Sequence, residues 1–155
     1  MYQESSISFN DSLLTALNLF NNHEWYEAHD AFEEIWNSVD GDERQVIQGI
    51  LQVSVSQFHL SKGNLNGATI LLGEGLGRIK TRTKINLGID LESFCQCLEN
   101  LLRKLQYKEL LNENDKPFFE TSLMNLNMLL SLMKLLFSIL IFFQENKKIN
   151  RSPGK

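Results

Sequence analysis

Apolar residues recur at helical spacing along most of this chain, and that spacing restricts the fold more than any other feature of the sequence. Between residues 43 and 62 it places Ile47, Ile50, Val55 and Phe58 on one stripe of a helix. No segment alternates apolar and polar residues for long, and no hairpin turn separates two apolar runs. A chain of 155 residues is long enough to bury a core. We therefore predict an all-α fold, built as a compact bundle or an irregular array of five to six helices.

Capping and turn residues set the expected limits of these helices. Asn10, Asp11 and Ser12 precede the first apolar stripe, and Gly63 lies in a turn after the third. The predicted helices cover residues 11–21, 24–37, 43–62, 65–84, 90–112 and 118–146. The expected domain organisation is an all-α domain over 1–115, a C-terminal apolar or amphipathic helix over 116–147 and a basic disordered tail over 148–155.

The predicted helix over 65–84 contains four glycines, Gly67, Gly73, Gly75 and Gly77. Each costs about 1 kcal/mol relative to alanine inside a helix. A dinucleotide-binding loop would need G-x-G-x-x-G after a strand in a βαβ unit, whereas the spacing here is G-x-G-x-G and no second strand is evident. Close packing of two helices through small residues is the better interpretation.

Charge is distributed unevenly along the chain, which has a net charge of −4. Residues 1–60 hold ten acidic side chains and one basic one, whereas residues 61–155 hold nine acidic and fourteen basic ones. The basic residues are scattered, so the sequence lacks the basic patch typical of a nucleic-acid-binding protein. Four of them end the 65–84 segment, where cations suit the helix dipole, and we expect a solvated helix end there: Arg78, Lys80, Arg82 and Lys84.

Cys95 and Cys97 are the only cysteines. Two residues apart on a helix, they point about 200° away from each other. They therefore form neither an easy disulfide nor half of a CxxC zinc site, and we expect reduced thiols. The first residues lack a basic segment followed by an apolar run, so no secretory signal is predicted. The expected location is the cytoplasm, or the plastid stroma if the protein is organellar.

Residues 126–143 form a nearly continuous apolar run, close to the shortest length that spans a membrane. Its polar interruptions, Asn127, Ser131, Lys134 and Ser138, all fall on one narrow helical stripe. A charge near the bilayer centre costs about 2.5–3.5 kcal/mol on insertion scales. We expect an amphipathic helix that covers the core or a partner chain; the alternatives are a membrane anchor and a helix lying on a membrane surface.

The segment from His23 to Trp36, HEWYEAHDAFEEIW, holds most of the candidate site residues. On a helix, Trp25, Phe32 and Trp36 fall to one side of His29, and Tyr26 and Glu33 fall to the other. Four further acids fall on the opposite half and are expected to face water: Glu24, Glu27, Asp30 and Glu34. His29 and Glu33 are thus expected at the flank of an aromatic stripe, where polar groups need partners.

The next predicted helix offers such partners. Gln48, Gln52 and His59 share a stripe, and Arg44 lies at its start. If the two helices pack antiparallel, Glu33 would meet Arg44 or Gln48, and His29 would lie nearer Gln52. The same residues could form either a buried network that fixes helix register or a pocket for a small molecule or anion.

Metal binding is a chemical alternative for this segment. His29 and Glu33 at i, i+4 are a sound pair of metal ligands, and His59 could be a third, which would suit a metal-dependent hydrolase. However, HxxxE is common by chance, and no ferritin-like pair of E-x-x-H motifs is present. No G-x-S-x-G, phosphate-binding loop or Cys/His dyad is present, so we predict neither an enzyme nor a cofactor.

Two blocks of the sequence resemble a bacterial and plastid family known as "domain of unknown function 309". One block is His23-Glu24-Trp25-Tyr26-Glu27-Ala28-His29 with Glu33 and Trp36; the other runs from Arg44 through Gln48–Gln52 to Phe58–Asn64. The resemblance covers roughly residues 12–80. It implies a small all-α domain, found in cyanobacteria and chloroplasts among others, and brings no established substrate, cofactor or mechanism. Its matched polar positions are His29, Glu33, Trp36, Arg44, Gln48, Gln52 and His59.

We therefore expect a binding or scaffold protein with a polar pocket or network between its second and third helices, and with an unidentified small-molecule or protein partner. One alternative is a metal-dependent hydrolase with His29, Glu33 and His59 as ligands. Another is a membrane-tethered adaptor anchored by residues 126–143, a segment that could also mediate oligomerisation.

Overall fold

A computed structural model describes residues 9–119 together with Met133 and Leu136. The chain divides into two compact units, residues 1–119 and 120–155. The first unit contains five helices, α1 (Phe9–Asn21), α2 (Trp25–Ser38), α3 (Gly41–Ser61), α4 (Leu65–Lys80) and α5 (Leu91–Tyr107), and a short 3₁₀ turn, η1 (Glu113–Asp115). Residues 9–119 contain no β-strand, so the all-α prediction is confirmed for the described part of the chain.

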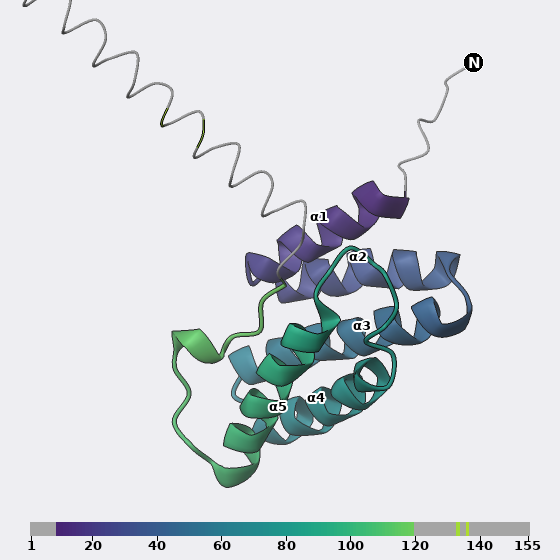
Figure 1. The fold of residues 1–155 in the computed structure, drawn as a ribbon. Helices are drawn as coiled ribbons and strands as arrows, with labels where there is room; N and C mark the ends of the chain where they lie inside the picture. Colours follow the sequence, from purple (N-terminus) through teal and green to yellow (C-terminus); the bar gives the residue numbers. More distant parts are fainter. Residues whose placement is uncertain (1–8, 120–132, 134–135, 137–155) are drawn as a thin grey trace, which may run out of the picture. The chain divides into compact units, whose positions relative to one another are not determined.

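Consecutive helices pack against each other in a compact array (Figure 1). α1 contacts α2, α2 contacts α3, α3 contacts α4 and α4 contacts α5. Phe20 of α1 is fully buried at the centre of this array. Its ring makes edge contacts with Trp25, Phe32, Phe94 and Phe119, with centroids 4.9–6.5 Å apart. Aromatic rings from three helices and from the segment after α5 thus share one core.

α3 and α4 approach each other closely because a glycine from each helix lies at the contact. A Cβ on Gly49 would lie 2.8 Å from the carbonyl oxygen of Gly75, and a Cβ on Gly75 would lie 2.6 Å from the carbonyl oxygen of Gly49. Neither helix can carry a side chain at these positions without moving. Close helix packing is therefore the structural role of Gly75, whereas Gly77 has no atom near its missing Cβ.

Two helices end earlier than the sequence pattern predicted. α4 stops at Lys80 rather than 84, and residues 81–84 form turns. α5 stops at Tyr107 rather than 112, because Lys108 takes a left-handed conformation with φ 54° and its backbone N–H bonds back to Leu105 and Lys104. Such a left-handed residue is a common helix C-cap.

The start of the predicted 118–146 helix also differs, since Phe118 and Phe119 belong to no helix. The rest of that segment, the apolar run at 126–143 and the basic tail lie outside the described residues, except that Met133 and Leu136 are helical with exposed side chains. Within the described residues, no helix combines the length and apolar character needed to cross a membrane.

A candidate ligand site between α2 and α3

The helical pattern of α2 separates its buried side chains from its acids. Trp25, Ala28, Phe32 and Ile35 are buried. The four acids expected to face water, Glu24, Glu27, Asp30 and Glu34, are all exposed. His29 is half-buried at the edge of the buried face.

Glu33 does not point inward as the sequence predicted. Its side chain is exposed, and it forms no hydrogen bond or ion pair with any residue that the structure describes. The reason is its helical position: Glu33 lies seven residues after Tyr26, on the same stripe, and Tyr26 is itself 60% exposed. The expected pairing of Glu33 with Arg44 or Gln48 is therefore not formed.

Arg44 instead contacts Trp36, the last aromatic residue of α2. Its guanidinium carbon lies 3.9 Å from the centroid of the Trp36 ring, and Nη1 donates a hydrogen bond to the Val39 carbonyl oxygen at 3.2 Å. This cation–π contact fixes the junction between α2 and α3. Two of the predicted site residues, Trp36 and Arg44, thus meet where α2 ends and α3 begins.

The two glutamines of α3 that were predicted at the site, Gln48 and Gln52, do not interact with the same residues. Gln48 is half-buried, and its side chain forms no hydrogen bond within the described part of the chain. Gln52 points to α4, where its Nε2 donates to Glu74 at 2.9 Å and its Oε1 accepts from Nε of Arg78 at 3.0 Å. Arg78 also donates to Oε1 of Gln45 at 2.9 Å.

Arg78 was expected at a solvated helix end, and this expectation is wrong, because it is the centre of a network between α3 and α4. Lys80 and Arg82 also have partners, in Glu99 and Asp42. The sequence does contain a signal for this network. Gln45 and Gln52 lie seven residues apart on α3, and Glu74 and Arg78 lie four residues apart on α4, so each pair falls on one face of its helix.

The remaining two predicted residues, His29 and His59, line one pocket. This pocket has a volume of about 240 Å³ and lies between the first turns of α2 and the last turns of α3; its lining is Trp25, Tyr26, His29, Val55, Phe58 and His59. The lining is mainly apolar. Sequence reasoning missed Val55 as a lining residue, because the helical projection assigned it to the core.

The rings around the pocket lie close to one another. The centroids of Tyr26 and Phe58 are 6.2 Å apart, those of Tyr26 and His29 are 6.5 Å apart, and those of Phe58 and His59 are 6.5 Å apart. Each imidazole is oriented by a polar neighbour: Nδ1 of His29 lies 3.0 Å from Oδ1 of Asp30, and Nδ1 of His59 lies 3.0 Å from Nδ2 of Asn64.

Residues 13–71 match the family model described as "Domain of unknown function (DUF309)". The matched span includes the whole pocket lining. This part of the chain is therefore similar to the DUF309 family. No curated protein matches the chain.

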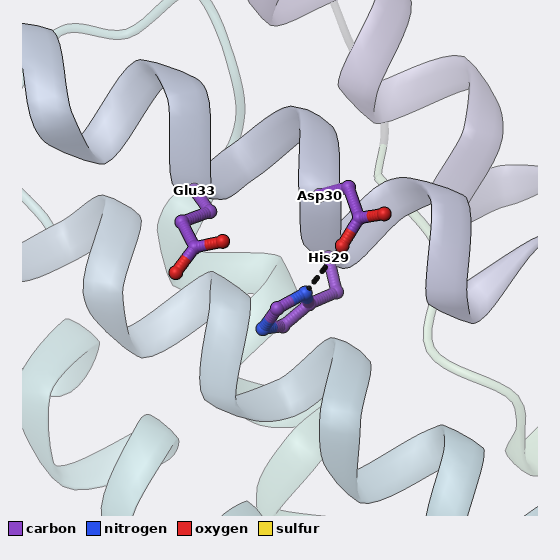
Figure 2. A group of neighbouring side chains, drawn as sticks. All are labelled: His29, Asp30 and Glu33. Atoms are coloured by element: carbon purple, nitrogen blue, oxygen red, sulfur yellow. Dashed lines mark hydrogen bonds and ion pairs between the residues drawn. The ribbon is translucent and has the colours of Figure 1, made fainter.

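Within the matched span, residues 13–71, the metal-binding potential lies on α2 alone. His29, Asp30 and Glu33 each offer a ligand atom, and these atoms all lie within 4.8 Å of one another (Figure 2). Asp30 and Glu33 are exposed. His59, the third ligand expected from the sequence, is not part of this group, so the structure assembles a different set from the predicted one.

The cysteines lie on α5, outside the matched DUF309 span, and both are free. Burial raises the pKa of the Cys95 thiol to about 11 and also raises the pKa of Cys97. Both thiols are therefore protonated at neutral pH, a state that suits neither nucleophilic attack nor metal binding.

Proposed function

We propose that this protein is a binding module and that its ligand site is the aromatic pocket between α2 and α3. The observation that supports this proposal is the arrangement of three aromatic rings and two imidazoles around one pocket of about 240 Å³. A mainly apolar pocket with a few polar groups that fix orientation is the usual form of a small-ligand site.

The size of the pocket limits its occupant. Sites for drug-sized ligands and cofactors have volumes of about 300–1,000 Å³. A pocket of about 240 Å³ suits a single ring or a branched alkyl head group rather than a nucleotide or a flavin.

Binding accounts for this lining better than catalysis does. The pocket lining contains two imidazoles but no serine, cysteine or carboxylate that an imidazole could activate. His29 and His59 instead have nitrogen atoms directed at Asp30 and Asn64, an arrangement that fixes the ring orientations.

The test is a titration of the full chain with small probes, phenol and 3,3-dimethylbutan-1-ol, followed by NMR of the imidazole, indole and backbone signals. We expect shifts confined to the pocket lining. Val55→Phe should abolish them because the larger side chain fills the pocket, whereas Ile70→Phe, which adds a ring at an exposed position of α4, should leave them unchanged. If neither probe shifts these signals, or if Val55→Phe has no effect, the proposal is wrong.

A metal-dependent hydrolase is the second candidate, and one observation favours it: the juxtaposition of His29, Asp30 and Glu33. It would have to use Asp30 in place of His59. Elemental analysis of the purified protein tests it, because a catalytic site must retain stoichiometric zinc, iron or manganese. A metal content far below one ion per chain would eliminate this candidate.

A further inference from the structure

We propose that the pocket between α2 and α3 recognises a positively charged organic ammonium group. This inference rests on the proposed function, because it names the class of ligand for the same site. Three features of the described residues support it: the spacing of the aromatic rings, the acidic stripe beside them and the contact that an ammonium group already makes with Phe58.

The aromatic rings provide the first argument. Cations are attracted to the faces of Trp, Tyr and Phe rings when they lie within about 6 Å of the ring centroid. Tyr26 and Phe58 both line the pocket with centroids 6.2 Å apart, so a cation between them can lie within that distance of both. Trp25 completes the lining from the core side.

Two of these rings, Trp25 and Tyr26, lie on α2, and the acidic side chains of this helix also favour a cation. Tyr26, His29, Asp30 and Glu33 follow one another at i, i+3, i+4 and i+7, so they lie along a single stripe of α2. The carboxylates of Asp30 and Glu33 lie within 4.8 Å of a nitrogen of His29, which itself lines the pocket (Figure 2). α2 carries no lysine or arginine. A cation in the pocket would therefore have two carboxylates close by and no lysine or arginine of α2 to repel it.

An ammonium group of the chain itself already contacts one of these rings. The ammonium of Lys62, at the C-cap of α3, lies 5.4 Å from the centroid of the Phe58 ring. The ring face thus already accommodates an ammonium group of the chain itself. Lys62 is exposed and is not among the residues that line the pocket, so its ammonium contacts the Phe58 ring without filling the pocket.

The decisive probes are choline and its neutral isostere 3,3-dimethylbutan-1-ol, which have the same shape and differ in charge. We expect choline to bind the full chain at least about fivefold more tightly, in line with the strength of cation–π contacts. Equal affinities would overturn the ammonium inference but leave the pocket as a ligand site. If neither probe bound, the proposed function itself would fail, so the two failures are distinguishable.

A matched pair of variants tests the acidic stripe. Glu33→Gln and Glu34→Gln make the same change in net charge at adjacent exposed positions, but only Glu33 belongs to the stripe beside the pocket. We expect Glu33→Gln to weaken choline binding at least about twofold and Glu34→Gln to leave it unchanged, with no effect of either on the neutral isostere. Equal effects of both variants would contradict the inference.

Lys62→Met provides the opposite test. Because this variant removes a positive charge that lies close to the Phe58 ring, choline should bind more tightly to it than to the natural chain. Unchanged or weaker binding would contradict the inference that a cation binds beside this ring. A trimethyllysine-containing peptide, titrated beside choline, identifies the source of the ammonium group. Tighter binding of the peptide assigns it to a protein partner, and tighter binding of choline assigns it to a free small molecule.

Discussion

Gln57 of α3 carries a hydrogen-bond donor that has no partner in the described part of the chain. Its side chain is only 3% exposed, and its Nε2 atom is fully buried. A buried polar group without a partner costs about 1–3 kcal/mol of stability. Five residues earlier on the same helix, Gln52 uses both ends of its side-chain amide.

We therefore predict opposite effects of one substitution at these two positions. Gln57→Met should stabilise the protein by about 1 kcal/mol, because it removes the unpaired donor and keeps the side-chain volume. Gln52→Met should destabilise it by about 1 kcal/mol, because Glu74 and Arg78 each lose a hydrogen bond. Thermal unfolding of the full chain measures both. A fall in Tm for Gln57→Met would mean that its amide has a stabilising partner.

Asp115 gives the stability of the protein a dependence on pH. Lys104 Nζ and the backbone N–H of Asn112 both donate to its nearly buried carboxylate, and these hydrogen bonds hold the pKa of Asp115 below its usual value. A group with a lowered pKa stabilises the fold above its unfolded-state pKa, about 3.9 for aspartate. That stabilisation is lost as the pH falls through the lower folded-state pKa.

We accordingly expect Asp115→Asn to unfold at a lower temperature than the natural chain at pH 7. The difference in Tm between the two should shrink as the pH falls below about 4, where the unfolded chain begins to take up a proton at this carboxylate, and should vanish below the lowered pKa of the folded state. Calorimetry at a series of pH values measures it. A difference that stays constant from pH 7 to pH 3 would contradict the role given to this ion pair.

At the scale of the elements, the contact between α3 and α4 depends on Gly49 and Gly75. A Cβ at position 75 would lie 2.6 Å from a backbone oxygen of α3 and 2.9 Å from a methyl carbon of Val53. Backbone cannot give way as a flexible side chain does, so the two helices would have to separate.

Gly75 and Gly77, on the same helix, form a matched pair for testing this contact. We predict that Gly75→Ala destabilises the protein by about 1–3 kcal/mol through overpacking. Gly77→Ala should instead stabilise it by up to about 1 kcal/mol, because nothing surrounds its missing Cβ and alanine favours the helix. Chemical denaturation gives both values. Equal effects at the two positions would contradict the close approach of α3 and α4.

The sequence predicted the helices better than it predicted the site. Apolar spacing and turn residues located five helices. Two of them end earlier than predicted, and at Lys108 the local backbone conformation ends the helix. Helical projection placed His29 correctly at the edge of the buried face, but it could not distinguish an edge that packs on α3 from an edge that faces water. Glu33 therefore appeared to need a partner that it does not have.

The partners of α3 were harder to predict for a different reason. Gln52 and His59 lie on one stripe of this helix, but the stripe contacts both α4 and α2. Gln52 forms hydrogen bonds with Glu74 and Arg78 on α4, whereas His59 lines the pocket beside α2. Sequence spacing shows which residues share one face of a helix. It does not show which neighbouring helix that face contacts, because this depends on how α3 is rotated about its axis, which the glycine contact with α4 sets.

At the scale of the whole molecule, the first compact unit extends to Phe119. The Phe119 ring is fully buried and stacks on Phe94 with centroids 3.9 Å apart. Its backbone N–H and carbonyl oxygen both bond to the side chain of Asn21, at 2.9 and 3.0 Å. The segment after η1 is thereby attached to the C-terminal end of α1, so the last described residues of this unit pack on its first helix.

We predict that Phe119→Ala destabilises the protein by about 3–5 kcal/mol, the usual cost of removing a buried phenylalanine ring. Phe118→Ala, at the adjacent exposed position, should change stability by less than about 0.5 kcal/mol. Equilibrium denaturation of the two variants compares them directly. Similar values would mean that the segment after η1 is not part of the core.

The central claim is that a ligand occupies the pocket between α2 and α3, and intermolecular nuclear Overhauser effects test it most directly. With choline added to the full chain, we predict contacts from its methyl protons to ring protons of Trp25, Tyr26 and Phe58. These contacts should disappear in Val55→Phe. Contacts to other parts of the surface, or none to these three rings at saturating choline, would contradict the account.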